Sequence, residues 1–288
     1  MPLAMRHDYA KDPTLLARVF ELYEHPWPGM TARAEGARGW GMRWEVSTPF
    51  LICEGEDVIS HVGVLDIHLV VAGRPMHVGG IHAVATHPHH RLRGHSRTLM
   101  EEALAWCDGR YGTLLLTGEP QLYDRYGFRS VLEHRFAGKR RGSGGRGLRL
   151  LNRKSAADGG LLLRLLDSRA PVSERLGIVR DRAIFLFDTA LWPLHYAEDL
   201  DAVVAYTVKD GTLKLYDVVA ERMPKLDDVL ARIPEPFEHI EVYFTPDRVG
   251  APDLAPESHP LGLDDHLMIR GPWPIEHEPA MLPVPARC

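Results

Sequence analysis

The pattern of apolar and polar positions divides the first half of the chain into strands and helices. Apolar side chains between residues 15 and 23 fall on one broad helical face, and Asp12 is suited to cap this helix. The stretch PFLICEGEDVISHVGVL then predicts two strands joined by a tight hairpin at Glu54–Gly55–Glu56. We expect a third strand over residues 76–86, after the turn AGRPM.

The pattern then changes to that of a helix over residues 96–108, followed by a short, wholly apolar strand in TLLLTG. Such a strand is typical of a buried parallel neighbour reached through a helical crossover. The stretch EPQLYDRYGF predicts a short helix ended by Gly127, and RSVLEHRFA predicts one further strand. Residues 1 to about 140 therefore predict an α/β domain.

The second half repeats part of this order. A Gly- and Arg-rich stretch, residues 138–147, predicts a linker or long loop. Beyond it, VVAYTVKDGTLKLYDVV predicts a hairpin on the Asp210–Gly211 turn, followed by a helix near residues 225–233 and a strand near 240–244. The remainder is a Pro-rich loop and an extended tail.

Composition places the chain among soluble globular proteins. It has 288 residues, 45% hydrophobic and 25% charged, with a net charge of -5, which gives no overall attraction to nucleic acid or to an anionic membrane. The N-terminal stretch lacks the apolar core of a secretory signal, and no run reaches the roughly eighteen apolar residues of a membrane helix. Three widely spaced cysteines predict a reduced, cytoplasmic protein. The oligomeric state is open, a homo-oligomer included.

The stretch AVATHPHHRLRGHSRTLM joins an apolar strand, a basic glycine loop and a helix start. A loop that enters a helix leaves backbone amides unpaired at the positive end of the helix dipole. Gly94 allows close approach of a ligand, and Arg91 and Arg93 add fixed positive charge. These features predict a diphosphate site, although a solvated basic turn that only starts a helix fits them too. The corresponding AERMPKL in the second half has no glycine and no net positive charge.

Two motifs resemble those of the GNAT superfamily of N-acetyltransferases. Residues 91–96, RLRGHS, resemble its acetyl-CoA loop, and LYDRYGFRSV, about thirty residues further on, resembles its Tyr-x-x-x-Gly-Phe turn. Together with GEPQ, which directly precedes the second motif, the two motifs are most similar to the enhanced-intracellular-survival (Eis) branch of this superfamily. Eis proteins have a GNAT domain, a degenerate GNAT-like domain and a third domain. The resemblance implies a mixed sheet flanked by helices in a GNAT domain at 1–145, and a degenerate GNAT-like lobe at 150–288 with no room for the third domain.

The resemblance also implies roles for individual residues. The backbone of three strand residues would pair with the pantetheine arm of acetyl-CoA: Val84, Ala85 and Thr86. The amides of the next segment would bind the pyrophosphate: Leu92, Arg93, Gly94, His95, Ser96 and Arg97, with Arg91 beside them. Gly118 and Glu119, at the end of the next strand, would flank the arm near the thioester.

The expected reaction takes place in a ternary complex. A primary amine, carried by a small molecule or a peptide, directly attacks acetyl-CoA. Tyr123 occupies the position of the tyrosine that donates to the departing sulfur, although packing against Phe128 would also explain it. The strand VGGIHAVAT lacks the glutamate that many GNAT enzymes use as base. His82 is one candidate base. The Eis resemblance implies another, the terminal carboxylate of Cys288.

Of three further hypotheses, two are disfavoured by the residues present and one remains beside the enzyme. The histidines of HPHHRLRGH lack a carboxylate or cysteine to complete a zinc site, so we predict no metal. The cationic stretch GKRRGSGGRG lacks interleaved aromatic residues, which favours a solvated linker over a nucleic-acid interface. The rival of a different class is a non-catalytic sensor or regulatory module that binds acyl-CoA.

Overall fold

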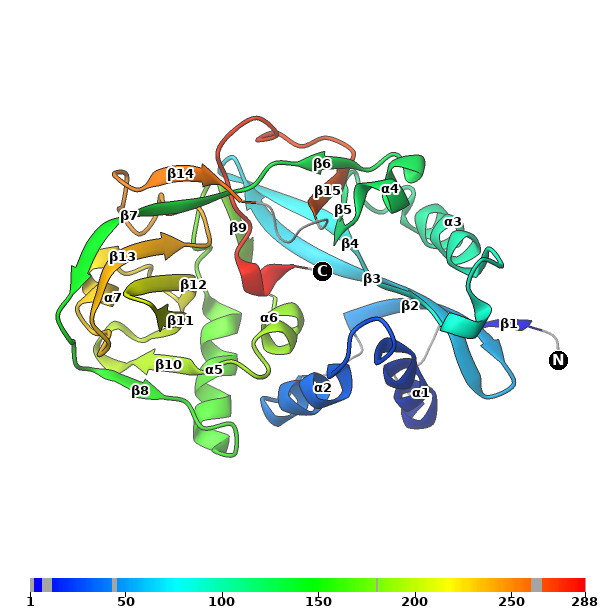
Figure 1. The fold of residues 1–288 in the computed structure, drawn as a ribbon, viewed down its shortest axis with the longest axis horizontal. Coiled ribbons are helices and arrows are strands. Elements are labelled where there is room, and N and C mark those ends of the chain that lie inside the picture. The colour runs from blue at the N-terminus through cyan, green and yellow to red at the C-terminus, as the bar shows by residue number, and fades with distance from the viewer. Residues whose placement is uncertain (1–2, 7–11, 43–45, 180, 260–265, 288) are drawn as a thin grey trace.

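The computed structural model describes residues 3–6, 12–42, 46–179, 181–259 and 266–287. Two mixed β-sheets lie side by side, with helices between them, so that the predicted α/β class is confirmed (Figure 1). Sheet A contains β1 (Leu3–Arg6), β2 (Ser47–Glu54), β3 (Asp57–Val71), β4 (Arg74–Thr86), β5 (Leu114–Gly118), β15 (His266–Arg270) and β6 (Arg129–Val131) in this order, with β9 (Leu176–Val179) paired to β3. Sheet B contains β14 (Ala255–Ser258), β7 (His134–Gly142), β13 (Phe237–Val242), β12 (Thr212–Ala220), β11 (Ala202–Lys209), β10 (Leu194–Ala197) and β8 (Leu148–Leu150).

The helices connect and cover these sheets. The α-helices are α1 (Pro13–Tyr23), α2 (Met30–Gly39), α3 (His95–Cys107), α4 (Pro120–Tyr123), α5 (Ala156–Ser168), α6 (Ala183–Asp188) and α7 (Leu226–Leu230). The short 3₁₀ helices are η2 (Pro88–His90), η3 (Asp124–Tyr126), η4 (Glu198–Leu200) and η5 (Val284–Ala286). The Asp12 carboxylate accepts hydrogen bonds from the amides of Thr14 and Leu15, which confirms the predicted cap of α1.

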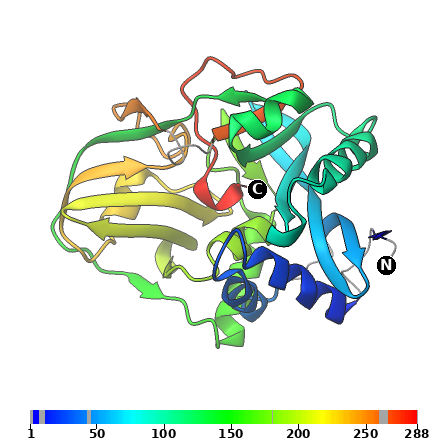
Figure 2. The same cartoon turned by 45° about the vertical axis from the view of Figure 1, so that its right-hand side comes forward.

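Alternation along the strands sends side chains to opposite faces of sheet A. In β2, Leu51 and Cys53 pack with α1, whereas Phe50 and Ile52 pack with α3. Figure 2 shows α1 and α2 on one side of this sheet and α3 on the other. The sheet is therefore covered on both faces by these helices, and within it a ligand can reach the backbone where two strands separate.

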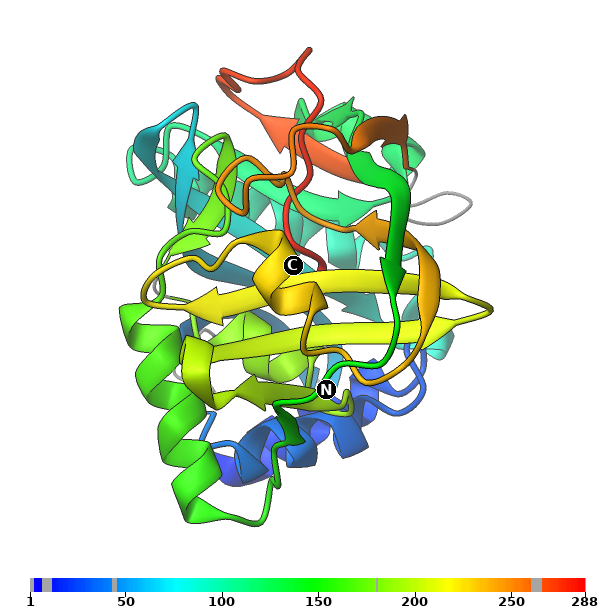
Figure 3. The ribbon, with the colours of Figure 1, turned by 90° about the vertical axis from the view of Figure 1, so that its left-hand side faces the viewer.

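Sheet B is covered in the same way by α5 and α7 (Figure 3). Val203 and Ala205 of β11 pack in the cluster with α5, and Ala202 and Val204 in the cluster with α7. The β11–β12 turn has positive φ at Asp210 and Gly211, 51° and 72°, which confirms the predicted hairpin.

The two sheets exchange segments, which the sequence pattern did not predict. The stretch expected as one strand breaks at Glu133: β6 belongs to sheet A and β7 to sheet B. Glu133 is buried and accepts a hydrogen bond from the Leu282 amide at 2.9 Å. Residues 138–142, predicted as linker, complete β7. Strand β15, to which the pattern assigned no strand, lies between β5 and β6.

Candidate active site

Strands β4 and β5 are paired over only part of their length. Their parallel ladder joins Gly79 with Leu114 and Gly80 with Leu115, yet β4 continues to Thr86 and β5 to Gly118. The other edge of β5 pairs with β15 as far as Gly118. The two strands thus diverge towards their carboxyl ends, and the opening between them offers strand backbone to an extended ligand.

A β-bulge at Ala83 accounts for this divergence. The β3–β4 register shifts between His61 and Gly63, and Ala83 has a φ of +50°, in the left-handed region. A bulge bends its strand and increases the local twist, which turns Val84 and the residues after it away from β5. The His61 Nδ1–H donates to the Ala83 carbonyl at 2.8 Å, and the Tyr23 hydroxyl lies 3.0 Å from His61 Nε2.

Buried polar contacts fix the segment beyond the bulge. The Ser60 hydroxyl donates to the Ala85 carbonyl at 3.0 Å and lies 2.9 Å from the Thr86 hydroxyl. His61 is fully buried, and burial lowers its pKa to about 4, so that it is neutral at pH 7. The predicted pantetheine strand is therefore held in place by neutral hydrogen bonds.

The loop after β4 turns sharply before α3. Leu92 has a φ of +61° with its side chain exposed, and Gly94, the cap residue of α3, has a φ of +83°. No side chain caps the helix start, so its first amides face outward beside Arg93. The Arg91 Nε donates back to the Thr86 carbonyl at 3.3 Å, whereas Arg97 pairs with Glu101 at 2.7 Å.

Tyr123 lies against the end of β5. A Cβ atom on Gly118 would come within 2.6 Å of the Tyr123 ring, so the absence of a side chain at Gly118 lets the ring pack there. The ring also makes an edge contact with Phe128, with the centroids 6.4 Å apart. Both alternatives considered for Tyr123, packing and a place beside the arm, are compatible with this position. Glu119, which directly follows Gly118 at the end of β5, has an exposed side chain.

The candidate bases differ in their surroundings. His82 lies on β4 with Nε2 at 2.7 Å from the Ser47 hydroxyl, and burial together with His61 lowers its pKa to about 3. An imidazole with so low a pKa accepts a proton poorly at neutral pH. Cys288 lies outside the described residues. Burial raises the pKa of the Cys107 thiol to about 11, which disfavours the thiolate that nucleophilic attack would need.

One titratable group escaped the sequence reasoning. Asp188 ends α6, and burial raises its pKa to about 8, while Arg33 at 3.9 Å opposes the shift. Its neighbour Phe187 packs against the hydrophobic cluster around α1 and β2, against which Ala83 also packs. No local motif marks this aspartate; the packing of α6 against α2 and η5 sets its position.

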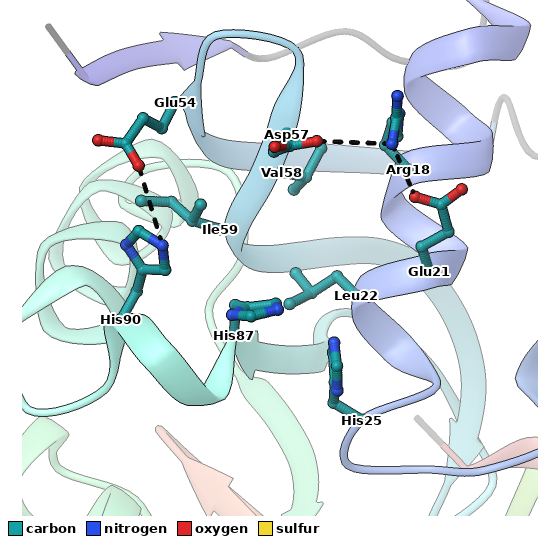
Figure 4. Close-up of a pocket in the computed structure, with 10 residues that line it drawn as sticks. All are labelled: Arg18, Glu21, Leu22, His25, Glu54, Asp57, Val58, Ile59, His87 and His90. Carbon is teal, nitrogen blue, oxygen red and sulfur yellow. Dashed lines mark hydrogen bonds and ion pairs between the residues drawn. The ribbon is translucent and has the colours of Figure 1, made fainter. Parts of the chain in front are cut away.

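A cavity of about 250 Å³ lies on the α1 side of the end of β4 (Figure 4). Imidazoles and carboxylates dominate its lining, which consists of Arg18, Glu21, Leu22, His25, Glu54, Asp57, Val58, Ile59, His87 and His90. Arg18 lies 3.5 Å from Asp57, and His90 lies 3.9 Å from Glu54. Because carboxylates outnumber arginines here, the cavity does not extend the anion site of the Gly94 loop.

The diverging strands, the bulge and the uncapped glycine loop all lie within one region of the chain that matches a known family. Residues 14–131 match the model of the acetyltransferase (GNAT) domain. This region is therefore an acetyltransferase domain of the GNAT type.

Solved structures resemble nearly the whole chain. A probable N-acyltransferase from Enterococcus faecalis has 15% identity and a TM-score of 0.57, covering 94% of this chain and 72% of its own. Eis1 from Mycobacterium abscessus has 17% identity and a TM-score of 0.57, with 93% and 73% covered. A putative acetyltransferase from Pyrococcus horikoshii has 13% identity and a TM-score of 0.52, with 99% and 96% covered. These likenesses show the fold.

No curated protein matches the chain in sequence. Among the described residues, none of the helices is both long and apolar enough to span a membrane.

Proposed function

We propose that the protein is an acetyl-CoA-dependent N-acetyltransferase that transfers the acetyl group to a primary amine by direct attack in a ternary complex. Two observations carry this proposal: the opening between β4 and β5, and the uncapped amides that follow Gly94 at the start of α3. We take the two as one ligand path. A thioester on an extended arm with a diphosphate at its far end has the shape of this path. The site lies in the matched acetyltransferase domain.

We assign the two ends of acetyl-CoA to the two ends of this path. The pantetheine arm pairs with the backbone of Val84–Thr86, and the pyrophosphate accepts hydrogen bonds from the amides of residues 92–97. The arginines at 91 and 93 add charge at the mouth of the path. Gly118 and Glu119 flank the arm near the thioester, where Tyr123 stands against the strand end.

The chemistry requires a neutral amine and a stabilised thiolate. A primary amine with a pKa near 10.4 is neutral in about one molecule in several thousand at pH 7, which costs about 4.6 kcal/mol. Tyr123 donates a hydrogen bond to the developing sulfur anion; full proton transfer from a phenol of ordinary pKa to the thiolate would be uphill by about 2 kcal/mol.

For the base, three groups remain in this proposal. His82 suits a hydrogen-bonding role better than proton uptake, because its pKa is about 3. The carboxylate of Cys288 stays a prediction. Asp188 is the group whose raised pKa, about 8, lies near the operating pH of a base at pH 7 to 8. Asp188 therefore joins His82 and the Cys288 carboxylate as a candidate base.

We further propose that the GNAT domain covers residues 1–145 and that residues 150–288 form a second, degenerate lobe that shapes the acceptor site. The division is compatible with two separate sheets, although β9 and β15 of the second half join sheet A. We place the enzyme in the cytoplasm, in keeping with the free, buried thiols of Cys53 and Cys107.

Acetyl-CoA binding is tested at Gly94. In Gly94→Val, we expect calorimetry to show binding weakened about 100-fold or more, because at least two charge-assisted hydrogen bonds of about 1.5–3 kcal/mol each are lost. Gly109→Val is the matched control: Gly109 has a φ of +78° at the other end of α3, and a Cβ atom meets nothing within 4 Å at either glycine. If both variants bind acetyl-CoA alike, the proposed loop site is wrong.

Turnover distinguishes the enzyme from an acyl-CoA sensor. With a panel of primary amines, we expect Tyr123→Phe to keep acetyl-CoA affinity and to lose about 100-fold or more in kcat. The same result in Asp188→Asn would identify Asp188 as the base, whereas an unchanged kcat would exclude it. Tight binding of acetyl-CoA by the unaltered protein without acetylation of any amine would favour the sensor.

A further inference from the structure

A triad of metal-ligating side chains lies on sheet A beyond the end of α3. Asp66 and His68 occupy alternate positions of β3 and so project from the same face, and His77 of β4 pairs directly with His68. The imidazoles of His68 and His77 are stacked, with centroids 4.7 Å apart. One potential donor atom from each of the three residues lies within 4.8 Å of the other two.

The donor atoms are turned towards one another. His68 Nε2 lies 3.7 Å from Asp66 Oδ2, and His77 Nε2 contacts Asp66 Oδ1. Ligands that share a tetrahedral zinc ion at about 2.0–2.2 Å stand about 3.3 Å apart, so small side-chain rotations suffice. The three side chains are about half exposed, 53%, 48% and 47% in sequence order, which leaves a further coordination position open to solvent.

A second contact orients the carboxylate. The Tyr111 hydroxyl donates to Asp66 Oδ1 at 3.1 Å, and the Tyr111 ring meets the His77 ring at 5.0 Å between centroids. An outer partner of this kind fixes a ligating carboxylate and is characteristic of metal sites. Two imidazoles with one carboxylate suit late first-row divalent cations rather than Mg²⁺ or Ca²⁺, which prefer all-oxygen sites.

We propose that Asp66, His68 and His77 bind a divalent transition-metal ion, with Zn²⁺ as its representative. The ion would cross-link the β3–β4 hairpin and keep an open position for water or another ligand. This site is separate from the histidine-rich HPHHRLRGH stretch and does not rest on the proposed acetyl transfer.

The test is calorimetry of the untagged, chelator-treated full chain with ZnCl₂. We expect one Zn²⁺ per chain. Loss of a direct ligand in His77→Ala or Asp66→Asn weakens binding more than about 100-fold, and loss of the outer partner in Tyr111→Phe weakens it about 10-fold. His239→Ala, which removes another exposed strand histidine, leaves the affinity unchanged.

Absorption of bound Co²⁺ provides a second measurement. We expect intense visible bands of a four- or five-coordinate ion in the unaltered protein and in His239→Ala, and their loss in His68→Gln. The proposal is overturned if the unaltered chain takes up neither ion, or if His77→Ala and His68→Gln bind as tightly as the unaltered protein.

Discussion

In each sheet an antiparallel hairpin leads through a helix to a strand parallel to the hairpin's second strand. The order is β3–β4–α3–β5 in sheet A and β11–β12–α7–β13 in sheet B. Both hairpins even carry a register shift, beside His61 in one and beside Ala205 in the other. The same framework is thus present twice, so what separates the two regions is how the space beyond the bulge is filled.

In sheet B this space holds protein. Asp217, next to the bulge, accepts from Arg169 at 2.8 Å with both side chains almost completely buried. The Ala170 amide donates to the carbonyl of Ala220 at the end of β12. In sheet A the corresponding strand end contacts a hydroxyl and an imidazole of β3 on one side and has an opening on its β5 side. A ligand can bind along a strand end only if backbone amides and carbonyls there have no partner within the protein, so that the ligand can form hydrogen bonds with them.

The loop after β4 and the loop after β12 also differ in whether their backbone amides already have partners within the protein. Gly94 starts the 13-residue helix α3, which has no side-chain cap, whereas α7 has five residues and its Leu226 amide is already bonded to the Val249 carbonyl. Within residues 221–225, all of which the structure describes, no φ is positive. The second loop therefore neither bends back on itself nor offers the same free amides.

The largest effect that we expect from this comparison is at the ion pair of sheet B. Asp217→Ala leaves the buried Arg169 guanidinium without the carboxylate that is hydrogen-bonded to it and should lower the free energy of unfolding by about 3–5 kcal/mol in urea titrations. The double variant Arg169→Leu/Asp217→Leu should recover most of this loss and leave acetyl-CoA binding unchanged. A loss below about 1 kcal/mol in Asp217→Ala would show that the pair does not fill this site.

A smaller effect is expected at the bulge of sheet A. His61→Leu leaves the Ala83 carbonyl without its imidazole donor and should cost about 1–3 kcal/mol in the free energy of unfolding at pH 7. Below pH 6.5 the unfolded chain binds a proton at His61 that the folded protein, with a pKa of about 4, does not. As the pH falls, the unaltered protein therefore loses the contribution of neutral His61 to its free energy of unfolding. The variant has no histidine at this position and does not show this loss.

The free energies of unfolding of the unaltered protein and of His61→Leu should accordingly differ less at pH 4.5 than at pH 7. Urea unfolding at each pH measures this difference. A difference that stays constant over this range would contradict a neutral, buried His61.

The smallest effect concerns the loop of sheet A. Leu92→Gly relieves about 1–2 kcal/mol of left-handed strain but adds about 0.5–1 kcal/mol of backbone entropy to the unfolded state, so stability should change by no more than about 1 kcal/mol. Because the exposed Leu92 side chain packs against nothing, acetyl-CoA affinity measured by calorimetry should change less than about threefold. A larger loss would assign the side chain itself to ligand binding.

Local signals were enough for much of the fold. The Asp12 cap, the Asp210–Gly211 turn and the strand–glycine loop–helix order around Gly94 were predicted because each depends on residues close in sequence. Helices α2 and α5 and strand β15 were missed. β15 is a five-residue run whose partners β5 and β6 lie more than a hundred residues earlier in the chain, and no local pattern reports such a pairing.

The amino-acid sequence by itself determined the GNAT motifs and the residues that we assign to acetyl-CoA, because turns, caps and close backbone approach follow from residue type at fixed short spacing. Tertiary structure decided the surroundings of the candidate bases, with burial lowering the pKa of His82 and raising that of Asp188. It also decided the register that places His77 opposite His68. Burial and strand register depend on the whole packed chain, which brings together groups that are distant in sequence.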